Sequence, residues 1–151
     1  GEDVTALIRS AQVDSIVSPV SVYPAVREHM VKLQRAIAQD VDVVMDGRDI
    51  GTVVLAESRC KFYLTASPEE RAARRQRDYA AQGRHVGLDK VCEEIAQRDM
   101  IDSTRRVSPL AVAPGAIVID CTAMTPAEVV TAMMQVVGRA DACSTQLLEG
   151  S

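Results

Sequence analysis

The residues best suited to chemistry in this sequence are arginines and aspartates that follow an apolar run. In "VDVVMDGRDIGTVV" (residues 41–54), the apolar run stops at Asp46, and Gly47, Arg48 and Asp49 follow it directly. An arginine fork fits the oxygens of a phosphate, and a carboxylate accepts hydrogen bonds from a donor-rich ligand edge. The segment therefore predicts a ligand site built on Arg48 and Asp49, with a salt-bridged turn as the structural alternative.

A second group of arginines lies in "SPEERAARRQRD". If this segment is helical, Arg71, Arg74 and Arg75 share one face, because residues three and four apart are neighbours on a helix. Arg71 and Arg75 then form a like-charge pair, which a solvated surface of alternating charges would avoid. The pattern favours binding of an anion such as triphosphate, and an ordinary charged surface explains it equally well.

A third group lies in "QRDMIDSTRRVSPL", where Arg98, Asp102 and Arg105 would project in one stripe if the helix persists. Two guanidiniums beside a carboxylate could clamp a phosphorylated sugar, since Asp102 accepts from hydroxyls while the arginines hold phosphate. An intrahelical ladder of ion pairs is the alternative. Together, the three arginine-bearing segments indicate phosphoryl transfer, which needs positioning and positive charge around the moving group.

Alternating periodicities predict the elements that must position these residues. We expect strands over residues 41–45, 60–66 and 116–120, and helices over residues 5–15, from 24 onward, 68–81, 89–103 and from 126 to near 138. "SPVSVYP" is expected to break the first helix, and Ser67 and Thr125 are expected to cap two later ones. Strands alternating with helices predict an α/β domain with a parallel sheet, whose ligands bind at the carboxyl ends of the strands.

Length and composition narrow the interpretation. The 151 residues suit one domain, and the net charge of −4 argues against non-specific nucleic-acid binding. No apolar run reaches membrane-spanning length and no signal peptide opens the chain, so we expect a cytoplasmic protein without a membrane partner. The four cysteines lack zinc-type spacing and are expected to be small buried side chains. Residues 141–151 are expected to form a frayed tail.

Three motifs in order, "DGRDIGTVV", "KFYLTASPEERAARR" and "RDMIDSTRRVSPL", resemble bacterial cytidylate kinases, a family of nucleoside-monophosphate kinases. "GEDVTALIRS" and "VYPAVRE" resemble the monophosphate-binding insert of this family and the helix after it. The resemblance runs from residue 1 to about residue 139. It implies a P-loop α/β fold with a parallel sheet and flanking helices, in which residues 1–40 are part of the NMP-binding region, residues 41–140 are the core, and a lid lies near 71–106.

The resemblance implies phosphoryl transfer from ATP to CMP or dCMP with Mg²⁺, by a monomer that takes no nucleic acid as partner. It places Ser18, Arg27 and Asp49 near the cytosine, Arg48 and Arg105 on the monophosphate as catalytic residues, Arg98 and Asp102 by the sugar, and Arg71, Arg74 and Arg75 by the ATP phosphates. A buried carboxylate at the base would accept from the cytosine amino group and reject UMP, whose ring presents the opposite pattern there.

One feature of the family is missing from the sequence: no segment fits the phosphate-binding pattern G-x-x-x-x-G-K-[ST]. Since the chain also opens at Gly1 without Met, we expect the sheet to lack the N-terminal P-loop strand, and the isolated chain to be inactive. Mg²⁺ would be held mainly by ATP and the missing loop. A non-catalytic CMP-binding module is the main alternative. A shikimate-type kinase is disfavoured by the insert motif and by "DGRD".

Overall fold

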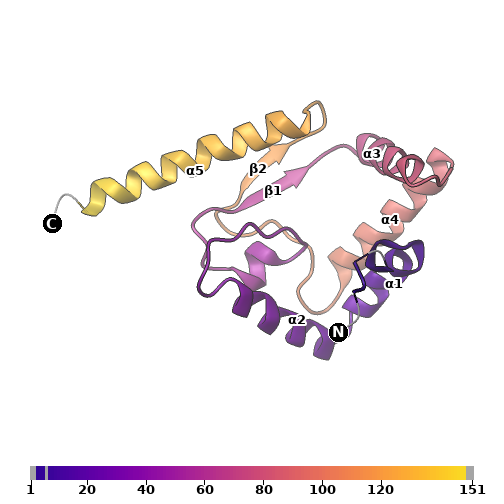
Figure 1. Cartoon of the computed structure of the whole chain (residues 1–151), viewed down its shortest axis with the longest axis horizontal. Coiled ribbons are helices and arrows are strands. Elements are labelled where there is room, and N and C mark those ends of the chain that lie inside the picture. Colours follow the sequence, from indigo (N-terminus) through magenta and orange to yellow (C-terminus); the bar gives the residue numbers. More distant parts are fainter. Residues whose placement is uncertain (1–2, 6, 149–151) are drawn as a thin grey trace.

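The computed structural model describes the backbone of residues 3–5 and 7–148, and their side chains except at positions 9, 11 and 139–148. Helices and strands follow one another in the order η1 (Leu7–Arg9), α1 (Ala11–Ser21), α2 (Pro24–Ile37), η2 (Ile50–Val54), β1 (Phe62–Thr65), α3 (Pro68–Ala81), α4 (Leu88–Thr104), β2 (Ile117–Asp120) and α5 (Pro126–Leu148). Helices α1 to α4 lie around one side of the strands, and α5 extends away from the other helices (Figure 1).

The sheet consists of two parallel strands among the described residues. β1 and β2 pair from Phe62 opposite Ile117 to Thr65 opposite Asp120, and α3 and α4 form the crossover between them. Both strands were predicted from their apolar runs, and their parallel pairing confirms an α/β arrangement.

The strand predicted over residues 41–45 is wrong for the described chain, where this segment belongs to no strand. Val44, within this segment, is 96% exposed. An extended apolar segment becomes a strand only when its backbone N–H and C=O groups pair with a neighbour. Within the part of the chain that the structure describes, β1 and β2 pair with each other and no strand lies beside residues 41–45.

The predicted starts of α3 and α5 are confirmed by their capping hydrogen bonds, whereas the first helix, predicted from residue 5, begins at Ala11. The Ser67 hydroxyl accepts from the Glu70 N–H at 3.2 Å at the start of α3. At the start of α5, the Thr125 hydroxyl accepts from the Glu128 N–H at 3.3 Å, and the Glu128 carboxylate accepts from the Thr125 N–H at 2.7 Å. This reciprocal pair is a capping box, which satisfies N–H groups that a helix leaves unpaired at its start.

Two predicted helix ends are wrong. The first helix does not end near residue 15: α1 continues through Pro19 and ends at Ser21, so the predicted break between helices lies within "SPVSVYP", before α2 begins at Pro24. Ser18 and Ser21 on this last turn contact Arg98 of α4 and Arg105 after it. Nor does α5 end near Gly138: it continues to Leu148, so most of the predicted tail is helical. A single glycine inside a helix costs about 1 kcal/mol, which the surrounding helical residues outweigh.

The best-defined apolar core lies between α3 and α4. Ala72, Tyr79 and Val91 are buried there, with Val86 and Ile95 packed against them. The apolar face predicted for α2 is present but exposed, at Val26, Met30, Leu33 and Ile37. Among the cysteines, Cys121 is buried as predicted, whereas Cys92 is exposed, and Cys143 lies outside the described side chains. In the described part of the chain, no helix has the length and apolar character to cross a bilayer.

Candidate functional site

Asp49 is buried where the extended "VDVVMDGR" segment turns into η2. Its backbone carbonyl accepts hydrogen bonds from the N–H groups of Val53 at 2.9 Å and Val54 at 3.2 Å, so the turn itself fixes the residue. Its carboxylate forms an ion pair with the guanidinium of Arg27, which reaches it from α2. The two residues predicted to lie at one ligand edge therefore touch, although they are far apart in the sequence.

Asp102 on α4 is the second buried carboxylate, and three arginines lie around it. It is 2% exposed. Its Oδ2 accepts from Arg48 Nε at 2.9 Å, its Oδ1 lies 3.6 Å from Arg105 Nη1, and Arg98 Nε lies 3.9 Å away. The spacing of four and three residues predicted this stripe, and the structure adds Arg48 from the distant "DGRD" segment.

Arg105, the residue just after α4, is the most enclosed of these arginines. Its Nε donates to the Ser108 carbonyl at 2.6 Å, and its Nη1 lies 3.4 Å from the hydroxyl of Ser21 on α1. Ser108 has a φ of 52°, a left-handed conformation that is uncommon for a residue with a side chain. The hydrogen bond from Arg105 helps to hold this strained turn in place.

α1 supplies the remaining predicted contact. The hydroxyl of Ser18, which is buried, accepts a hydrogen bond from Arg98 Nε at 3.1 Å. All seven residues predicted for the nucleotide therefore contact at least one other member of the set, and they come from α1, α2, the segment before η2, α4 and its end: Ser18, Arg27, Arg48, Asp49, Arg98, Asp102 and Arg105.

The electrostatics of this group, which we call the arginine–aspartate cluster, favour an anion. Its four guanidiniums and two carboxylates leave a net charge of +2. Burial, followed by the nearby charge of Arg27, lowers the pKa of Arg105, and Asp102 and Asp49 offset part of that effect. Two buried donors, Arg27 Nε and Arg105 Nη2, have no hydrogen-bond partner. Buried cationic donors without acceptors are costly, and the acceptor atoms of an anionic ligand would supply the missing partners.

The three arginines of α3 do not share one partner. Arg71 pairs with Asp99 of α4 at 2.6 Å, and Arg75 pairs with Asp14 of α1 at 3.0 Å. Arg74 pairs with Glu70 at 2.8 Å and donates to the Cys121 carbonyl, at the end of β2, at 2.6 Å. These contacts join α3 to three neighbouring elements, and their role toward ATP stays a prediction.

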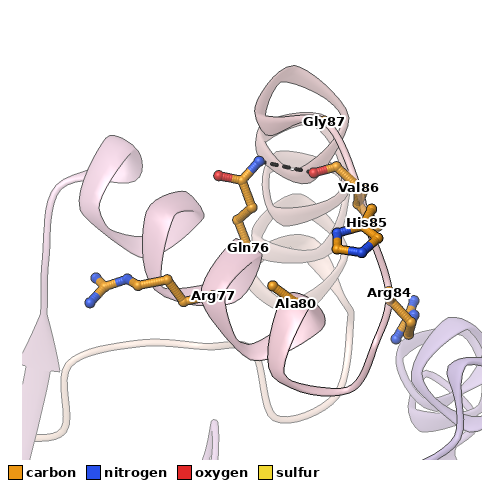
Figure 2. A pocket seen from close by; sticks show the side chains of 7 residues that line it. All are labelled: Gln76, Arg77, Ala80, Arg84, His85, Val86 and Gly87. Carbon is orange, nitrogen blue, oxygen red and sulfur yellow. Dashed lines mark hydrogen bonds between the residues drawn. The ribbon is translucent and has the colours of Figure 1, made fainter.

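Two hollows in the surface differ in their relation to the cluster. The larger, of about 450 Å³, lies between α3 and the loop before α4, where Gln76 donates to the Val86 carbonyl at 2.9 Å (Figure 2). It contains none of the predicted site residues. The second, of about 360 Å³, lies between α2 and η2 and includes Arg27 and Arg35 in its wall. Each hollow has an unpaired buried guanidinium donor in its wall, Arg84 Nη1 at the larger and Arg27 Nε at the second. We assign the site to the cluster because it combines two such donors with two buried carboxylates.

The sequence interpretation missed several partners in this region. Arg35 of α2 donates to the carbonyls of Val53 and Val54. Its spacing of eight residues from Arg27, two steps of four along the helix, is the signal that could have indicated it. Ser21 lies one helical turn after Ser18. Asp14 and Asp99 carry no pattern that distinguishes them from other acidic residues. Among the residues that the structure describes, no three His, Cys, Asp or Glu side chains gather to hold a metal ion.

The family model and curated relatives that match this chain carry the name cytidylate kinase. Residues 1–139 match the family model for cytidylate kinase. The chain is 47% identical over 137 residues to a cytidylate kinase of Carboxydothermus hydrogenoformans, covering 91% of this chain and 62% of that protein. It is 53% identical over 134 residues to one of Pelotomaculum thermopropionicum (89% and 59%), and 49% over 138 residues to one of Mycobacterium leprae (91% and 62%). The chain spans about three fifths of the length of these curated relatives.

Proposed function

The chain belongs to the cytidylate kinase family, and on this premise we propose that the protein containing it transfers a phosphoryl group from ATP to CMP or dCMP, giving CDP or dCDP. The relatives that are 47% and 53% identical to this chain are named cytidylate kinases, and the chain covers about three fifths of their length. Activity is therefore proposed for the longer protein, and the isolated chain is expected to lack turnover.

The observation that carries this proposal is the net positive charge of the arginine–aspartate cluster together with its two unpaired buried donors. A phosphate monoester carries a charge of about −1.5 to −2 at neutral pH and offers three strong acceptor oxygens. The cluster has a net charge of +2 and two buried guanidinium N–H groups without acceptors. The monophosphate of a nucleotide supplies the opposite charge and an acceptor for Arg105 Nη2, and a ring acceptor of the base would pair with Arg27 Nε, whereas a neutral ligand would leave the net positive charge without a counter-charge.

Within this proposal the residues have distinct tasks. Arg48 and Arg105 hold the monophosphate, whose oxygen is already nucleophilic and needs no general base. Arg98 and Asp102 contact the sugar. Asp49, held by Arg27, accepts from the cytosine amino group, while Arg27 and Ser18 donate to the ring acceptors. Uracil has a carbonyl at the position of that amino group, and placing it against the buried Asp49 carboxylate would leave two acceptors facing each other.

The described residues do not supply the loop that would bind the phosphates of ATP. Mg²⁺ neutralises phosphate charge in phosphoryl transfer, and it would be held mainly by the phosphates of ATP with one or two protein oxygens. The sequence also contains no G-x-x-x-x-G-K-[ST] loop. We propose that the longer protein supplies this loop, on a strand that pairs with residues 41–45 and β1. The 96% exposure of Val44 supports such a missing neighbour.

Arg71, Arg74 and Arg75 would contact the ATP phosphates only by exchanging their present partners. Arg71 and Arg75 pair with carboxylates that are about one third exposed, at 34% for Asp99 and 35% for Asp14. Such exposed pairs are weak, typically about 0–1 kcal/mol, so exchange for a polyphosphate is energetically feasible. Arg74 also holds two carbonyls after β2 and is the least available of the three.

A coupled assay of the complete protein tests the proposal against the alternative of a non-catalytic CMP-binding module. We expect ADP formation that depends on CMP, and we expect the 151-residue chain alone to show none. Calorimetric titration of the complete protein with CMP is the companion measurement. Binding of CMP without ADP formation would favour the binding module, and absence of both would refute the assignment of the cluster.

A further inference from the structure

Arg35 of α2 has no role among the proposed phosphate, sugar and base contacts. Its Nη2 donates to the carbonyl of Val53 at 2.7 Å, and its Nε donates to the carbonyl of Val54 at 3.0 Å. These carbonyls lie at the C-terminal end of η2, and the last carbonyls of a helical turn have no partner within it. Arg35 therefore ties this end of η2 to α2 through two charge-assisted hydrogen bonds.

The other end of η2 is held by the same helix. Asp49 caps the turn with its carbonyl and pairs through its carboxylate with Arg27 of α2. Arg27 and Arg35 are eight residues apart, which separates them by about 12 Å along the helix axis. With Val31 between them they form a row spaced by four residues, so both lie on one side of α2. α2 thus fastens the "DGRDIGTVV" segment on each side of the turn.

We propose that Arg35 is a positioning residue that fixes η2 on α2 and thereby holds Asp49 in register for reading the pyrimidine base. The inference rests on the proposed function, in which Asp49 accepts from cytosine. Without Arg35, the segment is held by the Arg27–Asp49 pair to α2 and by the Arg48–Asp102 pair to α4, both before η2, so the C-terminal end of η2 could move away from α2. The two hydrogen bonds from Arg35 add a second attachment to α2 and remove that freedom. Base discrimination depends on donor–acceptor distance and angle, so a small rotation of Asp49 weakens it.

Arg35→Met in the complete protein removes both hydrogen bonds and keeps a long side chain. Lys32→Met is the matched control, because Lys32 lies on the same helix and pairs with Glu28 in a largely exposed contact. For Arg35→Met we expect the KM for CMP to rise about tenfold and the ratio of kcat/KM for CMP over UMP to fall by a similar factor. The KM for ATP should stay within about twofold of wild type, and Lys32→Met should change none of the three values.

Arg35→Lys keeps a charged donor without the planar fork, so it should recover part of the lost discrimination. Wild-type CMP kinetics and discrimination in Arg35→Met would overturn the positioning role. So would a parallel rise in the KM values for CMP and ATP with discrimination unchanged, because that result indicates general loosening. If Arg35→Met does not fold, wild-type discrimination in Arg35→Lys overturns the inference. A wild-type protein that does not phosphorylate CMP refutes the proposed function first, and this inference falls with it.

Discussion

Replacing Asp102 by asparagine tests whether the arginine–aspartate cluster depends on this buried carboxylate. Asparagine keeps the shape of the side chain and removes its charge. Arg48 and Arg98 are partly exposed and can be solvated when the charge is lost, but the side chain of Arg105 is only 2% exposed. The Asp102 Oδ1–Arg105 Nη1 distance of 3.6 Å is therefore the contact that determines the cost.

The magnitude follows from that contact. At this separation, two unit charges attract by about 4.6 kcal/mol with an effective dielectric constant of about 20. Removing Asp102 also relieves the cost of burying a carboxylate, so we expect a net loss of about 3 kcal/mol in the free energy of unfolding. With a urea slope of about 2 kcal/mol/M, the unfolding midpoint of the complete protein should fall by about 1.5 M.

Asp99→Asn is the matched control for this experiment. Asp99 lies three residues earlier on α4 and pairs with Arg71, and both side chains are about one third exposed, at 34% and 36%. Breaking such a pair should cost about 0–1 kcal/mol. A decrease in the midpoint of less than about 0.5 M for Asp102→Asn, or one no larger than that of Asp99→Asn, would refute the central role of Asp102.

Two further predictions concern the base-reading carboxylate and the start of α5. Asp49→Ala in the complete protein should lower kcat/KM for CMP at least about a hundredfold while the KM for ATP stays nearly constant, and equal losses for both substrates would contradict a base-reading role. Hydrogen bonds from Thr125 lower the pKa of Glu128 below its usual 4.5, so the capping box should stabilise α5 fully above that pH and be lost as pH falls through the lowered pKa. Hydrogen exchange at the Thr125 amide between neutral and acidic pH measures this loss, and Glu128→Gln should make the exchange protection independent of that titration.

The predictions that succeeded from sequence depend on interactions between residues close in the chain. Ser67 and Pro68 specify the start of α3, and Thr125 with Glu128 specifies the start of α5, because caps bond within three residues. The spacing of Arg98, Asp102 and Arg105 predicted that these three charges meet, because residues three and four apart lie on one face of α4 and its C-terminal cap. The strands β1 and β2 were predicted from their apolar, β-branched composition.

Where the sequence prediction failed, partners distant in the chain decide the outcome. Residues 41–45 have the composition of a strand, but pairing requires a neighbour that no local pattern supplies. Pro19 should weaken a helix, yet α1 continues past it while Ser18 and Ser21 contact Arg98 and Arg105 from across the fold.

The sequence by itself therefore determined the motifs, most helix starts and the residue types suited to a nucleotide. Only the tertiary structure decided which charges meet, since Arg48 reaches Asp102 across 54 residues and Arg27 reaches Asp49 across 22. It also decided which donors of the arginine–aspartate cluster stay unpaired, Arg27 Nε and Arg105 Nη2. The physical reason is that capping and helical spacing act over a few residues, whereas burial and Coulomb interactions depend on distances in space that the chain sets only when it folds.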